Sequence, residues 1–222
     1  LRVKILHVVA SIHASTGGPA VSVTRLASEQ AKLLRNRRAE SGNRKDEVVV
    51  ACLDYPHLGP QVEAPGVRVV SVRGNFLAVR GRGWSPEFRR AVMEEARRAD
   101  IVHNHGLWMW PNAYAREAAE AAGKPLVISP RGMLEAWSLN RSKLRKAVAW
   151  RLFERKNLRA AAMFHATAES EAGSIKKVIN GVSEGRCFRG AGEREQGAED
   201  RGQGEVPIVV APNGVDLPDP GA

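Results

Sequence analysis

Residues 100–111 read D-I-V-H-N-H-G-L-W-M-W-P, and this stretch decides the interpretation of the whole chain. A short apolar run carries His103 and His105 and is followed at once by Gly106. Side chains two residues apart leave a strand on the same face, so we expect both imidazoles to point the same way. Gly106 allows the backbone to turn without a clash at Cβ. The stretch therefore predicts a strand that ends in a turn, with His105 at its carboxyl edge.

Two interpretations of this histidine pair remain open from the residues alone. Ligands bind at the carboxyl edge of open parallel sheets, and imidazole titrates near neutral pH, so His105 is a candidate for catalysis or ligand contact. Alternatively, both histidines are hydrogen-bonded residues at a strand end, with no chemistry. A metal site needs at least three protein ligands. Because neither Cys52 nor Cys187 lies nearby in the sequence, we predict no metal.

Apolar runs of strand length alternate with helix-like segments on both sides of this stretch. Strands are predicted at 3–9, 47–52, 67–72, 126–129, 164–166 and 207–210. Helices are predicted at 21–34, 85–98, 110–122 and 142–162, and after Thr167. Loops are predicted at 35–46 and 75–84, and a mobile loop or disordered insertion at 185–205, which has no apolar periodicity. The alternation predicts an α/β, Rossmann-like fold, a parallel sheet with helices on both faces.

The composition suits a single globular domain. The chain has 222 residues, of which 43% are hydrophobic, enough for a real core. Two cysteines are too few for a disulfide framework, so a reducing, cytoplasmic setting is expected. The longest apolar runs are strand-sized, so we expect no helix that crosses a bilayer. Residues 1–10 lack the long apolar segment of a signal peptide.

A net charge of +10 indicates a binding partner that is negatively charged. Such a charge favours nucleic acid, an anionic membrane surface or an anionic small ligand. We find no helix-turn-helix, zinc-finger or ribonucleoprotein motif, so no nucleic-acid partner is expected. Residues 131–159 hold nine Lys or Arg against two Glu. A solvated helix face explains this segment most simply, and contact with anionic lipid headgroups is the second interpretation.

Two short segments are candidates for binding an anion. Gly17 and Gly18 stand just before a predicted helix, where backbone amides favour an anion, although a plain turn explains the pair equally well. The pattern is neither G-x-G-x-x-G nor a P-loop, which argues against the dinucleotide and Walker classes. Arg131 follows the predicted strand at 126–129. Its guanidinium suits a phosphate or carboxylate, unless it is simply an exposed turn residue.

Six runs occur in an order that resembles a known family. They are K-I-L-H-V-V, S-T-G-G-P-A, D-I-V-H-N-H-G-L-W, P-L-V-I-S-P-R-G-M-L, F-H-A-T-A-E-S-E and A-P-N-G-V-D. Together they cover nearly the whole chain. They resemble the amino-terminal domain of glycosyltransferase family 4, the retaining GT-B enzymes also called group 1 glycosyltransferases.

The resemblance implies half of an enzyme that moves a sugar from a nucleotide-sugar to a glycan, lipid-linked or small-molecule acceptor. Residues 1–216 would form the acceptor-side domain and 217–222 the start of a linker. The donor domain would be absent, so we expect that the chain alone does not complete sugar transfer. The resemblance implies no cofactor besides the nucleotide-sugar substrate, no metal, and a place in the cytoplasm or at the inner face of the plasma membrane. A catalytically incomplete sugar- or nucleotide-binding module stays open as the alternative.

The resemblance also assigns roles to individual residues. Gly17 and Gly18 match the glycine loop that lies against the donor phosphates and the acceptor. His105 matches the histidine near the transferred sugar, where it would hydrogen-bond and stabilise charge. Arg131 and Trp108 would bind substrate, Arg131 through a phosphate or an anionic acceptor. Other polar residues are expected to be structural: His7, His165, Glu169 and Glu171.

Overall fold

Seven parallel strands form one sheet in the part of the chain that the computed structural model describes, residues 3–41, 46–183 and 206–212. The strand order is β3-β2-β1-β4-β5-β6-β7, so the chain reverses its direction of travel across the sheet between β1 and β4. The predicted α/β, Rossmann-like fold is confirmed. The strands are β1 (Lys4–Val8), β2 (Glu47–Asp54), β3 (Arg68–Arg73), β4 (Ile101–His105), β5 (Leu126–Ser129), β6 (Met163–Ala166) and β7 (Ile208–Val210).

Helices connect successive strands, as right-handed parallel crossovers require. The main ones are α1 (Gly18–Ser41), α3 (Pro86–Arg98), α4 (Trp110–Ala122) and α8 (Glu169–Ser183). The shorter ones are α2 (Phe76–Arg80), α5 (Ala136–Asn140), α6 (Lys143–Ala149) and α7 (Arg155–Arg159), with 3-10 turns η1 (Ala14–Thr16) and η2 (Pro56–Leu58). A π-helical turn, η3 (Trp150–Glu154), joins α6 to α7. None of the described helices is long and apolar enough to cross a membrane.

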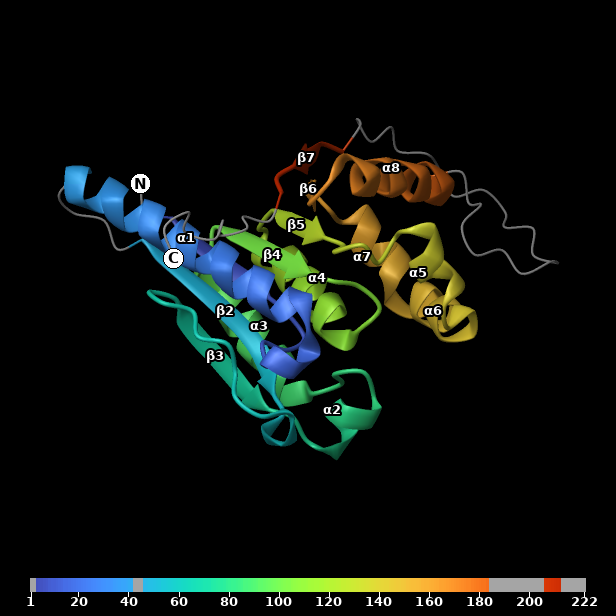
Figure 1. The fold of residues 1–222 in the computed structure, drawn as a ribbon, viewed down its shortest axis with the longest axis horizontal. Helices are drawn as coiled ribbons and strands as arrows, with labels where there is room; N and C mark the ends of the chain where they lie inside the picture. Colours follow the sequence, from blue (N-terminus) through green and yellow to red (C-terminus); the bar gives the residue numbers. More distant parts are fainter. Residues whose placement is uncertain (1–2, 42–45, 184–205, 213–222) are drawn as a thin grey trace, which may run out of the picture.

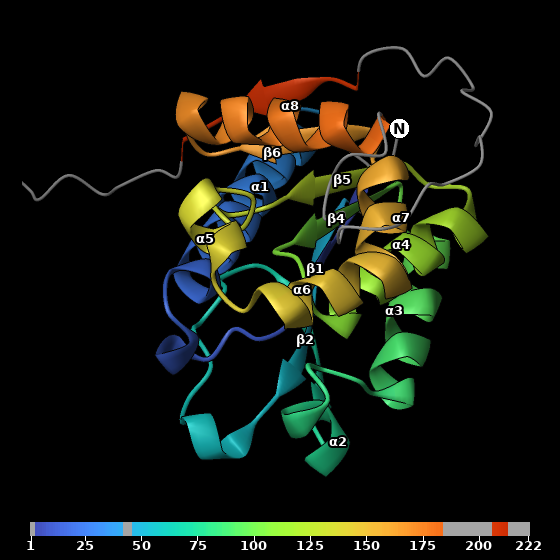
Figure 2. The same cartoon turned by 90° about the vertical axis from the view of Figure 1, so that its right-hand side faces the viewer.

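The two faces of the sheet have separate cores, because side chains alternate along each strand. On one face Val48 and Val50 share a buried cluster with Val23 of α1. On the other face Val49 belongs to a larger cluster that includes Phe88 of α3 and residues of α4 and α7. Figure 2 shows α1 on one side of the sheet and α3, α4 and α7 on the other. In Figure 1, α1 lies in front of the half of the sheet that holds β2, and α8 lies against β6 and β7.

Local signals in the sequence set several element ends where they were expected. Ser85 caps α3, because its hydroxyl accepts a hydrogen bond from the Phe88 amide at 3.1 Å. Pro86 occupies the first turn of the same helix. Gly123 ends α4 with a φ of 62°, a left-handed conformation that glycine adopts without strain. These ends fix where β4 and β5 begin, and so where their carboxyl ends meet.

Three predicted boundaries were wrong. The loop expected at 35–46 is helical as far as Ser41, since a run of Arg, Ala and Glu is favourable for a helix as well as for a solvated loop. The loop expected at 75–84 contains α2, capped by the Asn75 side chain, which accepts from the Ala78 amide at 2.9 Å. The helix expected at 142–162 is divided by the π turn. The insertion predicted at 185–205 and the linker predicted at 217–222 lie outside the described residues.

Candidate functional site

The predicted site residues follow three neighbouring strands. Gly17 comes after β1, His105 ends β4, and Arg131 follows β5. The loops after β1 and β4 run to opposite sides of the sheet, and ligands of open α/β sheets bind at such a point, beyond the carboxyl ends of the strands. Arg131 and His105 are in contact, with the guanidinium Nη2 3.3 Å from the imidazole Nδ1. The structure therefore brings the predicted arginine and histidine together.

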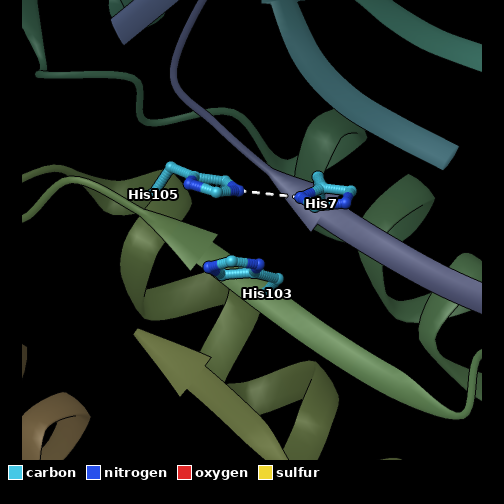
Figure 3. Close-up of side chains that lie close together, drawn as sticks. All are labelled: His7, His103 and His105. Carbon is cyan, nitrogen blue, oxygen red and sulfur yellow. Dashed lines mark hydrogen bonds between the residues drawn. The ribbon is translucent and has the colours of Figure 1, made fainter. Parts of the chain in front are cut away.

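Four histidines line one face of the sheet beneath this edge, although only two were considered as a pair. His7 on β1 lies opposite His103 on β4, and the imidazole of His105 follows two residues later on the same face. His7 Nδ1 and His105 Nε2 are 2.8 Å apart, and the rings of His103 and His105 are 4.1 Å apart (Figure 3). His165 on β6 completes the row, with its ring 5.7 Å from that of His103. We call these four residues the histidine row.

Hydrogen bonds at the ends of the row fix where each proton sits. The His7 Nε2–H donates to Gln30 Oε1 at 2.7 Å, which leaves His7 Nδ1 as the acceptor for His105 Nε2–H. His105 Nδ1 then accepts from Arg131. A second path runs through Ser129, whose hydroxyl lies 2.7 Å from His103 Nε2 and 2.8 Å from His165 Nδ1.

The second path also has one consistent direction. His165 Nε2–H donates to the Ala211 carbonyl at 3.0 Å, so its Nδ1 accepts from the Ser129 hydroxyl. His103 Nε2–H in turn donates to the Ser129 oxygen. Every member of the row is thus a neutral imidazole with its proton on Nε2, a pattern set by the carbonyl oxygens of Ala211 and Gln30.

Burial keeps the row neutral. Removal from water lowers the pKa of His7 to about 4, despite the hydrogen bond to Gln30, which acts in the opposite direction. Burial first, and then the neighbouring histidines and Arg131, hold the pKa of His103 and His105 well below its usual range. Burial also lowers the pKa of His165. At neutral pH the row therefore offers hydrogen bonds and not positive charge.

The row also contains the one group of described residues with the composition of a metal site, but its geometry suits hydrogen bonding better. Nitrogens of His7, His103 and His105 lie within 4.8 Å of one another. Two imidazole nitrogens on a tetrahedral zinc would be about 3.3 Å apart, each with a lone pair toward the ion. Here His7 and His105 share a proton across 2.8 Å, and the Arg131 cation adjoins His105. A metal would have to displace both contacts.

The glycine loop leaves open space above the start of α1. Gly17 has a φ of 88°, and a Cβ added at either Gly17 or Gly18 would meet nothing within 4 Å. The loop is anchored from below by His13, whose imidazole Nδ1 donates to the Gly59 carbonyl at 2.6 Å. An anion can therefore approach the amides at the start of α1 without hindrance from side chains.

Arg131 sits in a turn that is tied to α8. Its φ is +57°, and Gly132 follows with a φ of +73°. The Gly132 amide donates to Glu171 Oε1 at 2.7 Å, while the Thr167 amide and hydroxyl both donate to Glu171 Oε2 at 2.7 Å. Glu171 was expected to act on the helix dipole; in the structure it also joins the loops after β5 and β6. Burial lowers the pKa of Arg131, and the nearby Glu171 partly offsets this.

Trp108 is held in place by an acid that the sequence analysis did not select. The Trp108 backbone has a φ of +70°, and its amide donates to Glu154 Oε2 at 2.6 Å. Glu154 is fully buried at the end of the π turn, and burial raises its pKa to about 7. The Trp108 side chain is 3% exposed and packs against Trp150. Its contribution to substrate binding stays a prediction.

A cavity of about 330 Å³ lies at the opposite, amino-terminal edge of the sheet. It is lined by residues that include Glu47 and Arg68, both of them in ion pairs. Nearby, the Lys4 ammonium contacts Glu47 and Glu95 at 3.0 Å each, although Lys4 is 2% exposed. Since these charges neutralise one another, this edge is read as structural.

A known protein family and several solved structures match this chain. The family model described as "Glycosyl transferase 4-like domain" matches residues 17–186. No curated protein matches the chain.

Solved structures of HepE from Anabaena share the fold. The complex with UDP and glucose is 16% identical with a TM-score of 0.57, over 97% of this chain and 45% of HepE. The complex with UDP-glucose is 17% identical with a TM-score of 0.57, over 96% of this chain and 44% of HepE. The chain thus spans less than half the length of these HepE structures.

Proposed function

The chain belongs to the Glycosyl transferase 4-like domain family, and from this premise we propose that it forms the acceptor-side domain of a retaining glycosyltransferase of the GT-B type. The donor would be a nucleotide-sugar, and the acceptor a glycan, a lipid-linked sugar or a small molecule. The contact between Arg131 and His105, next to the point where the sheet changes direction, carries the proposal.

Each predicted site residue then has a physical task. As the sugar leaves its nucleotide, negative charge develops on the diphosphate, and positioned donors stabilise it. The amides after Gly17 and Gly18 and the Arg131 guanidinium are such donors. His105, buried and neutral, orients Arg131 through its Nδ1, and this nitrogen can accept a hydrogen bond from the sugar once the ligand draws the guanidinium aside. Trp108 supports the acceptor side. HepE, which shares the fold, was solved with UDP and glucose and with UDP-glucose, and this supports a nucleotide-sugar as the ligand.

NMR titration of the chain with UDP-glucose tests this proposal, because it detects weak binding. We expect shifts at the amides of Gly17, Gly18 and Arg131, and weakening of about tenfold in Arg131→Ala, the size expected for one lost charged hydrogen bond. Absence of any shift on the carboxyl edge would contradict nucleotide-sugar binding. When transfer is observed in the enzyme that contains this domain, an inverted anomeric product would contradict the retaining mechanism.

The alternative is a binding module without catalysis. The same titration separates the two, together with a nucleotide-release assay. Binding without release from any protein that contains this domain favours the module. Complete turnover by this chain alone would contradict its assignment as the acceptor half.

We further propose that transfer requires no metal and no cofactor besides the donor. The hydrogen bonds of the histidine row support this, since a metal would have to displace the contacts of His105 with His7 and Arg131. Activity that survives a chelator is the expected result, and activity that is lost with the chelator and restored by zinc would contradict it.

A peripheral contact with an anionic membrane at the cytoplasmic face is proposed from one surface. Leu144, Val148 and Leu152 lie four residues apart on α6 and η3, with exposed fractions of 80%, 51% and 58%. Residues four apart share a helix face, so they form one apolar stripe. Basic residues flank it, which suits anionic headgroups. A membrane-bound acceptor would then lie close to the carboxyl edge.

A further inference from the structure

We propose that Arg82, Arg141, Arg145 and Lys146 form a subsite that binds an anionic group of the acceptor, a phosphate ester or a carboxylate. We call these four residues the cation group. The inference rests on the proposed function, because it names the acceptor chemistry of the same carboxyl edge.

Two members of the cation group, Arg82 and Lys146, contact Trp108, three residues beyond His105. Arg82 precedes α3, and its Nε donates to the Trp108 carbonyl at 2.9 Å. Lys146 on α6 places its ammonium 5.5 Å from the centre of the Trp108 ring. The same ammonium donates to the Ser138 carbonyl and, at 3.2 Å, to the Ser138 hydroxyl. Two cations from distant parts of the sequence are therefore aimed at one segment of the site.

The members of the group act on one another as like charges. Burial lowers the pKa of Lys146, and Arg82 and Arg141 lower it further. Burial likewise lowers the pKa of Arg82, and Arg145 adds to the effect, while Glu154 acts in the opposite direction. Repulsion of this kind costs free energy unless an anion lies between the charges.

The described residues supply little negative charge in return. Among the ion pairs of residues 3–41, 46–183 and 206–212, none that is resolved includes a member of the cation group. Glu154 is the acid that faces Arg82, but it is buried, and its pKa of about 7 leaves it partly protonated at neutral pH. Among the described residues, Arg82 therefore has only a weak acid for a neighbour, and the Lys146 ammonium contacts no carboxylate.

Lys4 is a buried lysine with a structural role, and its partners can be compared with those of Lys146. Lys4 and Lys146 are 2% and 8% exposed. Lys4 contacts two carboxylates, whereas Lys146 contacts a carbonyl, a hydroxyl and an aromatic ring. Buried charges are normally paired, so the arrangement around Lys146 is that of a site completed by a ligand.

The backbone of the subsite is strained as well. Arg82, Trp108 and Ser142 have φ values of +57°, +70° and +53°, and Arg131 is the other non-glycine residue with a positive φ among those the structure describes. Side chains are disfavoured in this conformation, and such residues gather where a site needs a fixed geometry. The strain here coincides with the cation group and with the turn that carries Arg131.

The chemistry of the group selects its ligand. Guanidinium groups bind the paired oxygens of phosphates and carboxylates through two parallel hydrogen bonds. The glycine loop after β1 already offers an anion site for the donor diphosphate. The cation group is built from other elements, α6 and the loops before α3 and α6, so the anion it receives belongs to the acceptor.

Isothermal titration of the chain with glucose 6-phosphate, glucuronate and glucose tests the subsite. We expect binding of one or both anionic sugars and much weaker binding of glucose. Comparison of glucose 6-phosphate with glucuronate shows whether the subsite prefers a phosphate ester or a carboxylate. Arg145→Gln, at an exposed position, is expected to weaken binding about tenfold, the effect of roughly 1.4 kcal/mol. Lys146→Met should do the same, with a melting temperature measured to show that the fold persists.

Arg90→Gln is the matched control, because it removes one exposed positive charge from α3. It should leave binding within the error of the measurement. Equal binding of all three sugars, or equal weakening in Arg90→Gln and Arg145→Gln, would overturn the subsite. Titration with UDP-glucose separates this failure from a failure of the proposed function. If UDP-glucose shifts the Gly17 and Gly18 amides while the anionic sugars do not bind, the subsite alone is wrong; if neither binds, both are.

Discussion

Gly18 shows at the scale of one residue how the glycine loop can be tested without damage to the fold. It is the first residue of α1, and a Cβ there would meet nothing within 4 Å. We predict that Gly18→Ala keeps the free energy of unfolding or raises it by up to about 1 kcal/mol, since alanine favours a helix over glycine. Binding of UDP should weaken about tenfold, because the methyl group would stand where a phosphate approaches the amides.

The control for this prediction is Gly173→Ala on α8, where a Cβ also meets nothing within 4 Å. It should have the same small effect on thermal unfolding and none on UDP binding. Gly17→Ala is a poor test, because the φ of 88° disfavours any side chain there. If UDP bound Gly18→Ala as tightly as the native chain, the glycine loop would be only a turn.

The sequence could predict only those site residues whose position depends on the end of a strand. Parallel strands place their carboxyl ends together, which is why His105 and Arg131 were expected at one edge and are found in contact. Glu154 could not be found this way, because it lies among basic residues and 46 positions from its partner Trp108. His7 and His165 were expected to be structural, and alignment of the strand ends would have shown that they share a row with His103.

At the scale of elements, the apolar stripe of α6 and η3 is the surface proposed to contact a membrane, and vesicle flotation can test this contact. We predict that the chain floats with vesicles of phosphatidylcholine and phosphatidylglycerol but not with phosphatidylcholine alone. Leu144→Asp should reduce flotation about tenfold, since burial of a leucine contributes about 1.5–3 kcal/mol. Leu33→Asp is the control, because Leu33 is 67% exposed but lies on α1.

Three outcomes would contradict the membrane contact. Absence of flotation with anionic lipid would show that the chain does not bind such a membrane. Equal loss in Leu144→Asp and Leu33→Asp would show that added negative charge, and not the stripe, decides binding. A dimer in solution that Leu144→Asp dissociates would assign the stripe to a second copy of the chain.

Hydrophobic periodicity was enough to predict whether a segment is a helix or a strand. The end of an element could be predicted only where a capping residue or a glycine marks it. Ser85 and Gly123 marked theirs, and α3 and α4 have the predicted ends. The end of α1 carries no such mark, and a charged run is compatible with both helix and loop. The π turn lies within a continuous helical pattern of hydrophobic residues, so the spacing of those residues could not predict it.

At the scale of the whole molecule, the histidine row makes stability depend on pH. The folded-state pKa values of His7, His103 and His105 lie below the ordinary value of 6.5. The unfolded chain therefore binds more protons than the folded one below pH 6.5, and the free energy of unfolding falls as the pH drops toward 4. Glu154 has the opposite sign, because its raised pKa makes the folded state lose stability as the pH rises from 4.5 to about 7. Several histidines outweigh one glutamate, so we predict a net loss on acidification.

Urea unfolding between pH 7 and pH 5 measures this slope. His7→Gln should reduce it by up to about 1.4 kcal/mol per pH unit, the limit for one whole proton, while glutamine can still accept from His105 and donate to Gln30. His57→Gln, which removes an exposed histidine on η2, is the control and should leave the slope unchanged. An unchanged slope in His7→Gln would mean that the row is hydrated in solution.

The orientation of the hydrogen bonds along Arg131, His105, His7 and Gln30 has one further consequence. Each group donates to the next in a single direction, away from the edge and toward the back of α1. A proton cannot travel outward along this path unless all the imidazoles exchange tautomers together. The Nδ1 lone pair of His105 is covered by Arg131, and an anion that draws the guanidinium aside would uncover it. The arrival of such a ligand would thus make His105 available as a base, whereas the contact with Arg131 keeps its Nδ1 covered.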